Sequence, residues 1–207
     1  MKTSLEIVDE VASIVHQRMA GQQAGHGVDH VRRVHRNACE IQAASGGDRF
    51  VVELAAWLHD VGDAKFHDGV ERSGEFSEEI LCQLGVEPAI VQHVVHIVDN
   101  LSFRKRDSAE PLSLEGQIVQ DADRLDAIGA IGIVRTIEFG AAFGQPFHLS
   151  GADPTDPNSP KTGMRHFYDK LFRLKGLLNT DAAKQIAEQR EQFMHSFVDQ
   201  FRRESEG

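Results

Sequence analysis

The stretch LAAWLHDVGDAKFH, residues 54–67, joins an apolar run to a histidine and an aspartate. Asp48 can cap a helix that enters this stretch, and Val51, Ala55 and Leu58 would share its buried face. His59 and Asp60 then follow at the end of the run. Ionisable side chains are costly to bury without partners. The pair must therefore face water, a partner in the core, or a metal ion.

Apolar residues recur at helical spacing along nearly the whole chain, and no convincing run with the two-residue period of a strand occurs. One expected helix carries Leu5, Val8, Ala12, Val15 and Met19, and the next carries Val31, Val34, Ala38 and Ile41 and ends at Gly46-Gly47. Further helices are predicted over 73–84, 88–100, 113–139 and 165–178. Thr180 caps a last one, with Ile186, Phe193, Phe197 and Phe201 on its apolar stripe. The fold class is therefore predicted to be all-α, a helical bundle.

One segment interrupts this pattern: GQPFHLSGADPTDPNSPKTG, residues 144–163, holds four of the six prolines. A surface loop is the preferred interpretation, because the sequence after it is too short and amphipathic to fold alone. We therefore expect a single domain over 1–207, with a core at about 25–140 and C-terminal helices at 164–204 packing on it.

The composition of the chain limits the classes of molecule that it is expected to bind. The chain has 207 residues, a formal net charge of −10 and a pI near 5.5, which argues against nucleic acid or an anionic membrane as a general partner. The first residues, MKTSLEIVDE, do not read as a signal peptide, and no run approaches the ~18 apolar residues of a membrane span. Cys39 and Cys82 are expected to be small buried side chains in a reducing cytoplasm. The predicted location is the cytoplasm.

Histidines and acids gather in four places: GHGVDH (25–30), HDVGD (59–63), HVVHIVD (93–99) and QDADRLD (120–126). Imidazoles and carboxylates drawn from separate helices are how metal sites in helical bundles are built. Such a nitrogen and oxygen set favours manganese, iron or cobalt, with magnesium a poorer match to imidazole. Structural zinc would need thiolates, and neither cysteine has CxxC spacing.

The order His30, then His59-Asp60, then an aspartate in ADRL resembles the H…HD…D signature of HD-domain metal-dependent phosphohydrolases. DHVRRV, LAAWLHDVGDAKFH, QDADRLDAIGAIGIVRT and HFYDKLFRLKGLLNT are similar to the bacterial YpgQ/YedJ-like branch, so the likeness covers nearly the whole chain. The dyad alone is short, whereas the ordered set in its helical context is specific.

The resemblance implies that His30, His59 and Asp60 bind the metal. Asp123 is preferred as the fourth ligand because Ala122 precedes it and Leu125 follows two residues later; Asp121 is the alternative.

By the same resemblance, Asp63 would orient or deprotonate the attacking water, although many relatives carry Glu there and Asp63 could merely cap the helix end. Lys65 and Arg124 would bind phosphate, with a plain surface role as the alternative for Lys65. His26 would bind substrate or orient His30, or it only shapes the Gly-rich turn.

Enzymes of this superfamily with two metals supply extra histidines. His93 and His96 are candidates, but Asn100 to Phe103 follows where another histidine is usual. One metal ion is therefore predicted, and His93 and His96 would line a pocket or form a hydrogen-bonded helix face.

The expected cofactor is one divalent ion, with Mn²⁺ as first choice and Mg²⁺, Co²⁺, Fe²⁺ and Ni²⁺ as alternatives.

The resemblance implies hydrolysis of (deoxy)nucleoside triphosphates to monophosphate and pyrophosphate. Alternatives are a 5'-nucleotidase, a phosphodiesterase for cyclic or alarmone nucleotides, or a non-catalytic nucleotide sensor. The partner is thus a small-molecule nucleotide. The oligomeric state is open, with a homodimer as one option.

Overall fold

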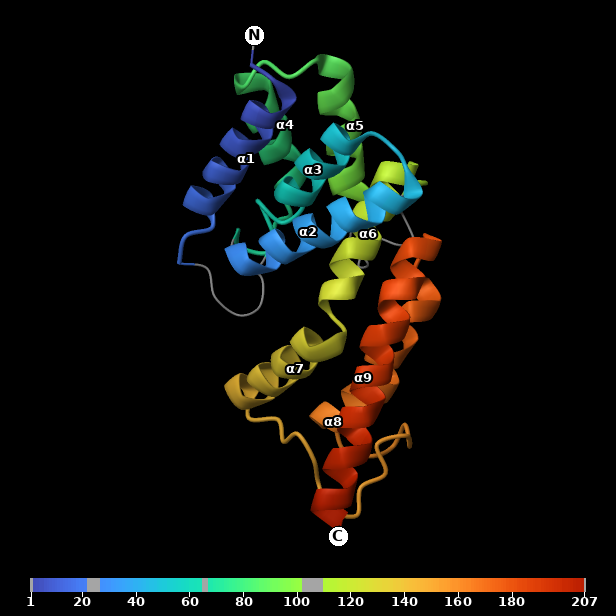
Figure 1. Ribbon diagram of the computed structural model, residues 1–207. Helices are drawn as coiled ribbons and strands as arrows, with labels where there is room; N and C mark the ends of the chain where they lie inside the picture. Colours follow the sequence, from blue (N-terminus) through green and yellow to red (C-terminus); the bar gives the residue numbers. More distant parts are fainter. Residues whose placement is uncertain (1, 22–26, 65–66, 102–109, 207) are drawn as a thin grey trace. The chain divides into compact units, whose positions relative to one another are not determined.

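The computed structural model describes residues 2–21, 27–64, 67–101 and 110–206, and in these ranges the regular structure is helical, with no strand (Figure 1). The elements are α1 Ser4–Arg18, α2 Val28–Ser45, α3 Arg49–Leu58, α4 Ser73–Gln83, α5 Pro88–Asn100, α6 Leu114–Asp126, α7 Gly129–Phe143, α8 Gly163–Asp169, η3 Leu171–Arg173, η4 Lys175–Leu177 and α9 Asp181–Glu206. The all-α prediction is confirmed.

The chain forms two compact units, Met1–Ala122 and Asp123–Gly207, and their boundary falls inside α6. The first unit holds α1 to α5 and most of α6, and the second holds α7 to α9. The proposed domain limits, a core at about 25–140 with C-terminal helices at 164–204, stay a prediction.

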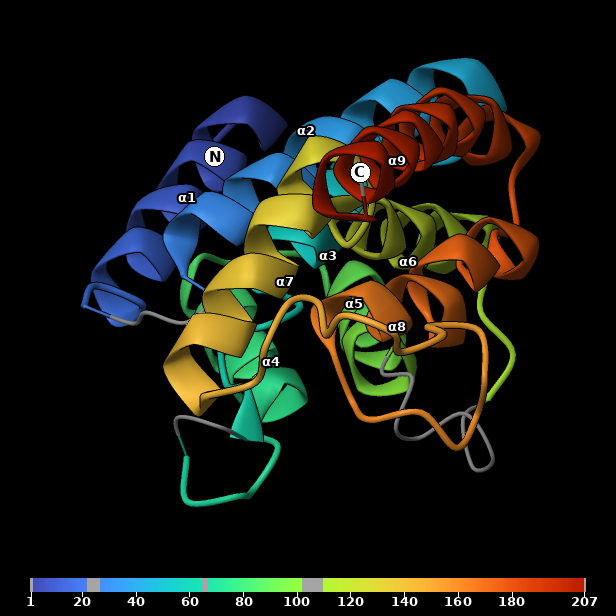
Figure 2. The same cartoon turned by 90° about the horizontal axis from the view of Figure 1, so that it is seen from below.

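Helix α3 is the centre of the first unit. It packs against α1, α2 and α5, and α4 packs on α5 (Figure 1, Figure 2). Every residue from Val51 to His59 is buried except Glu53. A helix that is apolar all round is stable only where neighbours cover every side. The predicted inward face of Val51, Ala55 and Leu58 is confirmed and is only part of the buried surface.

The turn between α2 and α3 has the structure that the sequence predicts. Helix α2 ends at Ser45, directly before Gly46, as predicted. The Asp48 carboxylate then accepts hydrogen bonds from the backbone N–H groups of Phe50 and Val51, at 2.8 and 3.3 Å. Asp48 is thus the predicted N-cap, and its bonds satisfy N–H groups that have no partner inside the helix.

In the second unit, α9 contacts α7 and η4. The buried stripe of α9 contains no aromatic side chain and consists of Ala183, Ala187, Met194 and Val198. The predicted stripe was therefore wrong: Phe193 is 52% exposed, and Phe197 and Phe201 are half-buried against the Phe147 ring. Alanines allow close helix approach, so the larger aromatic residues flank the contact.

Three further predictions about the helices differ from the structure. The helix predicted over 113–139 is two helices, α6 and α7, because the chain leaves the helical path after Asp126: Ile128 is extended, and Gly129, the first residue of α7, has φ +74°. The helix predicted over 165–178 is the short α8 followed by the 3₁₀ turns η3 and η4. Leu5, placed on the apolar stripe of α1, is 69% exposed.

The connection from Phe143 to Gly163 contains no helix or strand and is mostly exposed, as expected of a surface loop. Among the described residues, no helix combines the length and the apolar character that crossing a membrane requires.

Candidate metal centre

His30 lies in the first turn of α2. Gly27 is the N-cap of this helix, and the backbone N–H of His30 donates to the Gly27 carbonyl at 2.9 Å. The neighbouring Val31 and Val34 are fully buried and hold this end of α2 in the core. His30 is itself only 2% exposed. An imidazole at this depth needs a polar partner or an ion.

His59 and Asp60 follow the last turn of α3. The Nδ1 atom of His59 lies 2.9 Å from the carbonyl oxygen of Ala56. Because a carbonyl oxygen only accepts hydrogen bonds, Nδ1 carries the proton and the lone pair is on Nε2. A backbone carbonyl that fixes the tautomer in this way is typical of histidines that bind metal. His59 is therefore oriented to offer Nε2 as a ligand.

Three ligand atoms of these residues converge. His59 Nε2 lies 3.3 Å from His30 Nε2, and Asp60 Oδ2 lies 3.5 and 3.6 Å from these two nitrogens. Atoms that share one ion are roughly 2.9–3.6 Å apart when the bonds are about 2.0–2.2 Å long. The structure brings these three predicted ligands together, and the donor set fits one divalent ion.

The chain after the dyad is held by a close backbone contact. The backbone N–H of Gly62 donates to Ser73 Oγ at 3.1 Å, and the Arg72 N–H donates to the Gly62 carbonyl at 3.0 Å. A Cβ on Gly62 would lie 2.5 Å from the Arg72 carbonyl carbon. Only glycine allows this approach, which ties the dyad to the start of α4.

The two aspartates considered for the fourth ligand differ in burial. Asp121 is fully buried and belongs to the same compact unit as His30, His59 and Asp60, whereas Asp123 is exposed. The carbonyl of Ala122, next to Asp121, accepts a hydrogen bond from Asn37 on α2 at 3.4 Å. Burial thus favours Asp121, against the preference drawn from the motif.

The other predicted residues have separate positions. Asp63 is half-buried, and its N–H donates to the Asp60 carbonyl at 3.1 Å, so one tight turn separates it from the dyad. Arg124 donates to the carbonyl oxygen of Leu177 within the second unit. His26 and Lys65 lie outside the described residues.

His93 and His96 make hydrogen bonds of their own. His93 Nε2 lies 2.8 Å from Ser113 Oγ, and His96 Nε2 lies 3.2 Å from the Pro111 carbonyl oxygen. These contacts agree with the expected hydrogen-bonded helix face. The number of metal ions stays a prediction.

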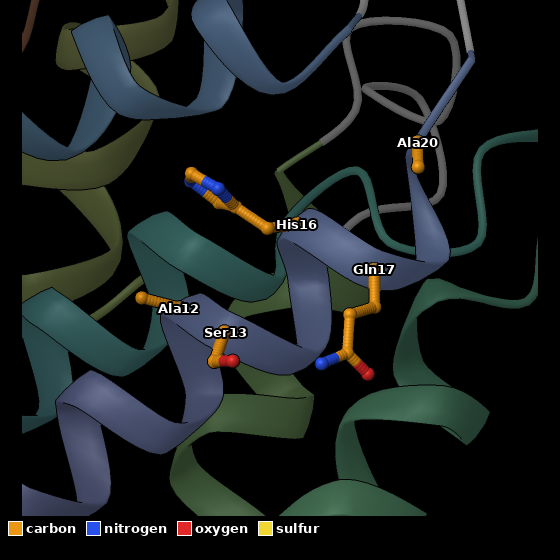
Figure 3. Close-up of a pocket in the computed structure, with 5 residues that line it drawn as sticks. All are labelled: Ala12, Ser13, His16, Gln17 and Ala20. Atoms are coloured by element: carbon orange, nitrogen blue, oxygen red, sulfur yellow. The ribbon is translucent and has the colours of Figure 1, made fainter.

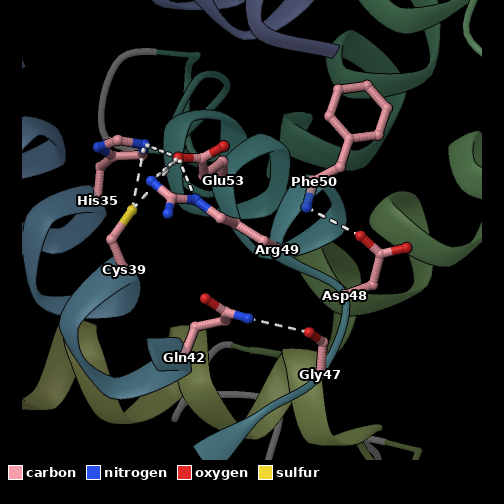
Figure 4. Close-up of polar contacts among 8 residues, drawn as sticks. All are labelled: His35, Cys39, Gln42, Gly47, Asp48, Arg49, Phe50 and Glu53. Atoms are coloured by element: carbon pink, nitrogen blue, oxygen red, sulfur yellow. Dashed lines mark hydrogen bonds and ion pairs between the residues drawn. The ribbon is translucent and has the colours of Figure 1, made fainter. Parts of the chain in front are cut away.

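A second group of potential ligands was missed by the sequence reasoning: His35, Cys39 and Glu53, between α2 and α3 (Figure 4). Two features of the sequence could have revealed it. His35 and Cys39 have i, i+4 spacing on one helix, and Glu53 is the one acid inside an apolar run.

The prediction that both cysteines are buried was wrong, because Cys39 is half-buried and Cys82 is exposed.

A pocket of about 490 Å³ lies beside α1 and the turn after it. It is lined by Ala12, Ser13, His16, Gln17 and Ala20 (Figure 3). The one ionisable side chain among them, His16, has its Nε2 atom 3.3 Å from an Arg32 nitrogen. None of the predicted site residues lines this pocket, so we assign it no role.

Comparisons with known proteins match these features. The family model described as HD domain matches residues 27–128. The Bacillus subtilis protein YpgQ is 38% identical over 205 residues, which are 98% of this chain and 96% of YpgQ. A crystal structure from Bacillus thuringiensis, described as an HD-superfamily hydrolase, has 39% identity and a TM-score of 0.82 and covers 98% of both chains. The structure of YpgQ in complex with ADP has 34% identity and a TM-score of 0.80, covering 100% of this chain and 98% of YpgQ.

The Gly62 contact gives a testable prediction. Gly62→Ala should lower the free energy of unfolding and weaken manganese binding, because the new methyl group pushes the dyad away from the Arg72 backbone. We expect a loss of about 1–3 kcal/mol in urea unfolding. Gly176→Ala is the matched control, since its Cβ meets nothing within 4 Å. Equal behaviour of the two variants would contradict this role of Gly62.

Proposed function

We propose that this chain, which belongs to the HD domain family, is a metal-dependent phosphohydrolase that converts (deoxy)nucleoside triphosphates to monophosphate and pyrophosphate. One observation carries the proposal: His30, His59 and Asp60 bring three ligand atoms within 3.6 Å of one another in a mostly buried site. The likeness to a chain described as an HD-superfamily hydrolase, over 98% of both, supports the reaction class.

The proposed ligands of the ion are His30 Nε2, His59 Nε2, Asp60 Oδ2 and a carboxylate oxygen of Asp121. Two imidazoles with two carboxylates favour manganese over magnesium, which binds imidazole less readily. We choose Asp121 over Asp123 because Asp121 is buried in the same compact unit as the other three proposed ligands, whereas Asp123 is exposed.

A nucleotide is the proposed substrate because YpgQ, similar over its whole length, has been crystallised with ADP. The net charge of −10 makes the general surface of this chain unfavourable for an anion. Positive charge must therefore be local. A divalent ion in the centre supplies it, with Lys65, Arg124 and His26 as the proposed contacts to the phosphates.

In the proposed reaction, water adds to a phosphorus atom and the bond to the oxygen bridging the α and β phosphates breaks, releasing pyrophosphate. A divalent ion held by His30, His59, Asp60 and Asp121 would acidify the water and polarise a phosphoryl oxygen. Asp63 orients this water and accepts its proton. The Ala56 carbonyl keeps the His59 proton on Nδ1, and the Gly62 contact holds Asp60 in place.

Product analysis tests the function. The intact protein is incubated with Mn²⁺ and a panel of nucleoside triphosphates, monophosphates and cyclic or alarmone nucleotides. We expect pyrophosphate from triphosphates, and no turnover by Asp60→Ala with the fold preserved in circular dichroism. Orthophosphate from monophosphates would indicate a nucleotidase, an opened ring a phosphodiesterase, and binding without turnover a sensor. Any of these would overturn the proposed reaction.

Asp63 is tested by a nearly isosteric change. Asp63→Asn removes the base but keeps hydrogen bonding, so kcat should fall by a factor of about 10²–10⁴ while manganese affinity is unchanged. Asp68→Asn, an exposed position five residues on, is the matched control and should keep wild-type kcat. If Asp63→Asn stays within about threefold of wild type at saturating metal and substrate, Asp63 only caps the helix end.

The fourth ligand is tested by a matched pair of variants. Asp121→Asn should weaken manganese binding by roughly 10–100-fold or more, because even groups next to metal ligands contribute that much. Asp123→Asn should leave the affinity unchanged. Isothermal titration calorimetry measures both. The opposite order of effects would restore Asp123 as the ligand.

A further inference from the structure

Helices α2 and α3 carry a second cluster of ligand-type side chains, separate from the candidate metal centre. His35 and Cys39 lie one turn apart on α2, and Glu53 faces them from α3 (Figure 4). His35 follows His30 by five residues, which is roughly 140° around the helix and about 7.5 Å along it. The two clusters therefore use different faces of α2.

The three side chains converge at bonding distances for a metal. Cys39 Sγ lies 3.7 Å from His35 Nε2 and 3.6 Å from Glu53 Oε1, and the latter two atoms are 3.8 Å apart. The centre of this nearly equilateral triangle is about 2.1 Å from each corner, which matches zinc–nitrogen and zinc–oxygen bonds and is slightly shorter than a zinc–sulfur bond. An ion slightly out of the plane would satisfy all three.

Burial shifts the pKa of two of these side chains in opposite directions. Burial lowers the pKa of His35, and the effect exceeds that of the nearby Glu53 carboxylate, so the ring is neutral at neutral pH and offers a lone pair. Burial, followed by Glu53, raises the pKa of the Cys39 thiol to about 11. Cys39 is thus a protonated and unreactive thiol until an ion displaces its proton.

Arg49 provides the charge that balances Glu53 in this structure. Its Nε and one terminal nitrogen each lie 3.2 Å from Glu53 Oε1, the oxygen that also faces His35 and Cys39. The Arg49 side chain is 67% exposed, so it can turn into water at little cost when another cation arrives. His35, in contrast, is held in place, since its ring packs 4.9 Å from Trp57.

We propose that His35 Nε2, Cys39 Sγ and Glu53 Oε1 bind a zinc-class divalent ion that joins α2 to α3. On binding, the thiol proton leaves to water, the Arg49 guanidinium moves away from Oε1, and water fills the fourth position. The nitrogen, sulfur and oxygen donor set selects zinc or cobalt over manganese and magnesium. This inference does not depend on the reaction proposed above.

Cobalt(II) is the probe, because a cobalt–thiolate bond gives a charge-transfer band in the near ultraviolet and the candidate metal centre has no thiolate. The intact protein is titrated with Co²⁺ under reducing conditions. Wild type should develop this band, which reports only on the ion bound to a thiolate, and added Zn²⁺ should remove it. Cys82→Ser, the matched cysteine control, and Asp60→Asn, which alters the candidate metal centre, should both keep it.

Variants of the cluster identify the ligands. Cys39→Ser should lose the charge-transfer band. His35→Ala and Glu53→Gln should need a higher cobalt concentration for half of the full band intensity, with folding checked by circular dichroism. Arg49→Met should need a cobalt concentration that is roughly two- to fivefold lower, the factor that corresponds to an exposed ion pair. This gain is not expected if the variants merely disturb folding.

The opposite results would overturn the site. No band in wild type at millimolar cobalt would exclude a metal site at Cys39. A band that survives Cys39→Ser and disappears in Cys82→Ser would assign it to the exposed cysteine. Unchanged or weaker cobalt binding by Arg49→Met would remove Glu53 from the ligand set.

Discussion

The burial of α3 on every side determines where His59 and Asp60 lie. Burying one aliphatic side chain of this kind stabilises a protein by about 1.5–3 kcal/mol, and α3 contributes several, among them Val52, Leu54 and Leu58. Such a helix has little freedom to slide or rotate, because each shift would expose apolar surface. The ionisable pair that follows α3 therefore meets His30 at a fixed position. The catalytic proposal depends on this rigidity more than on any single polar contact.

The sequence predicted this part of the molecule well because local and long-range signals agree there. The Asp48 cap, the end of α2 and the apolar run all point to the same helices, and the ordered motif predicted the approach of His30 to His59. The sequence prediction failed where two sets of apolar side chains on one helix could each form the buried face. On α9 two apolar stripes fit the helical period, and the one with Ala183 and Ala187 is buried because small residues allow close packing.

The choice between Asp121 and Asp123 shows a further limit. Apolar residues flank both, so helical periodicity cannot separate them, and the motif pattern favoured the aspartate that is exposed. Burial is a property of the packed helix and not of its local pattern. The same reason explains why His35, Cys39 and Glu53 escaped notice. A search for CxxC spacing considers one segment of chain, whereas this cluster combines an i, i+4 pair with an acid from another helix.

Helices α2 and α3 are joined by a short turn and pack against each other, so they form a helical hairpin whose two clusters lie at different levels. Asp48 caps α3 at the turn, Cys39 and Glu53 meet farther along, and His30 meets His59 at the open end. The middle cluster contains a thiol, and the three residues at the open end contain none. Ions that prefer sulfur would therefore bind at the middle cluster, and ions that prefer oxygen would bind at the open end. An ion in the middle would also fix the spacing of the two helices that position His30, His59 and Asp60, without touching those three residues.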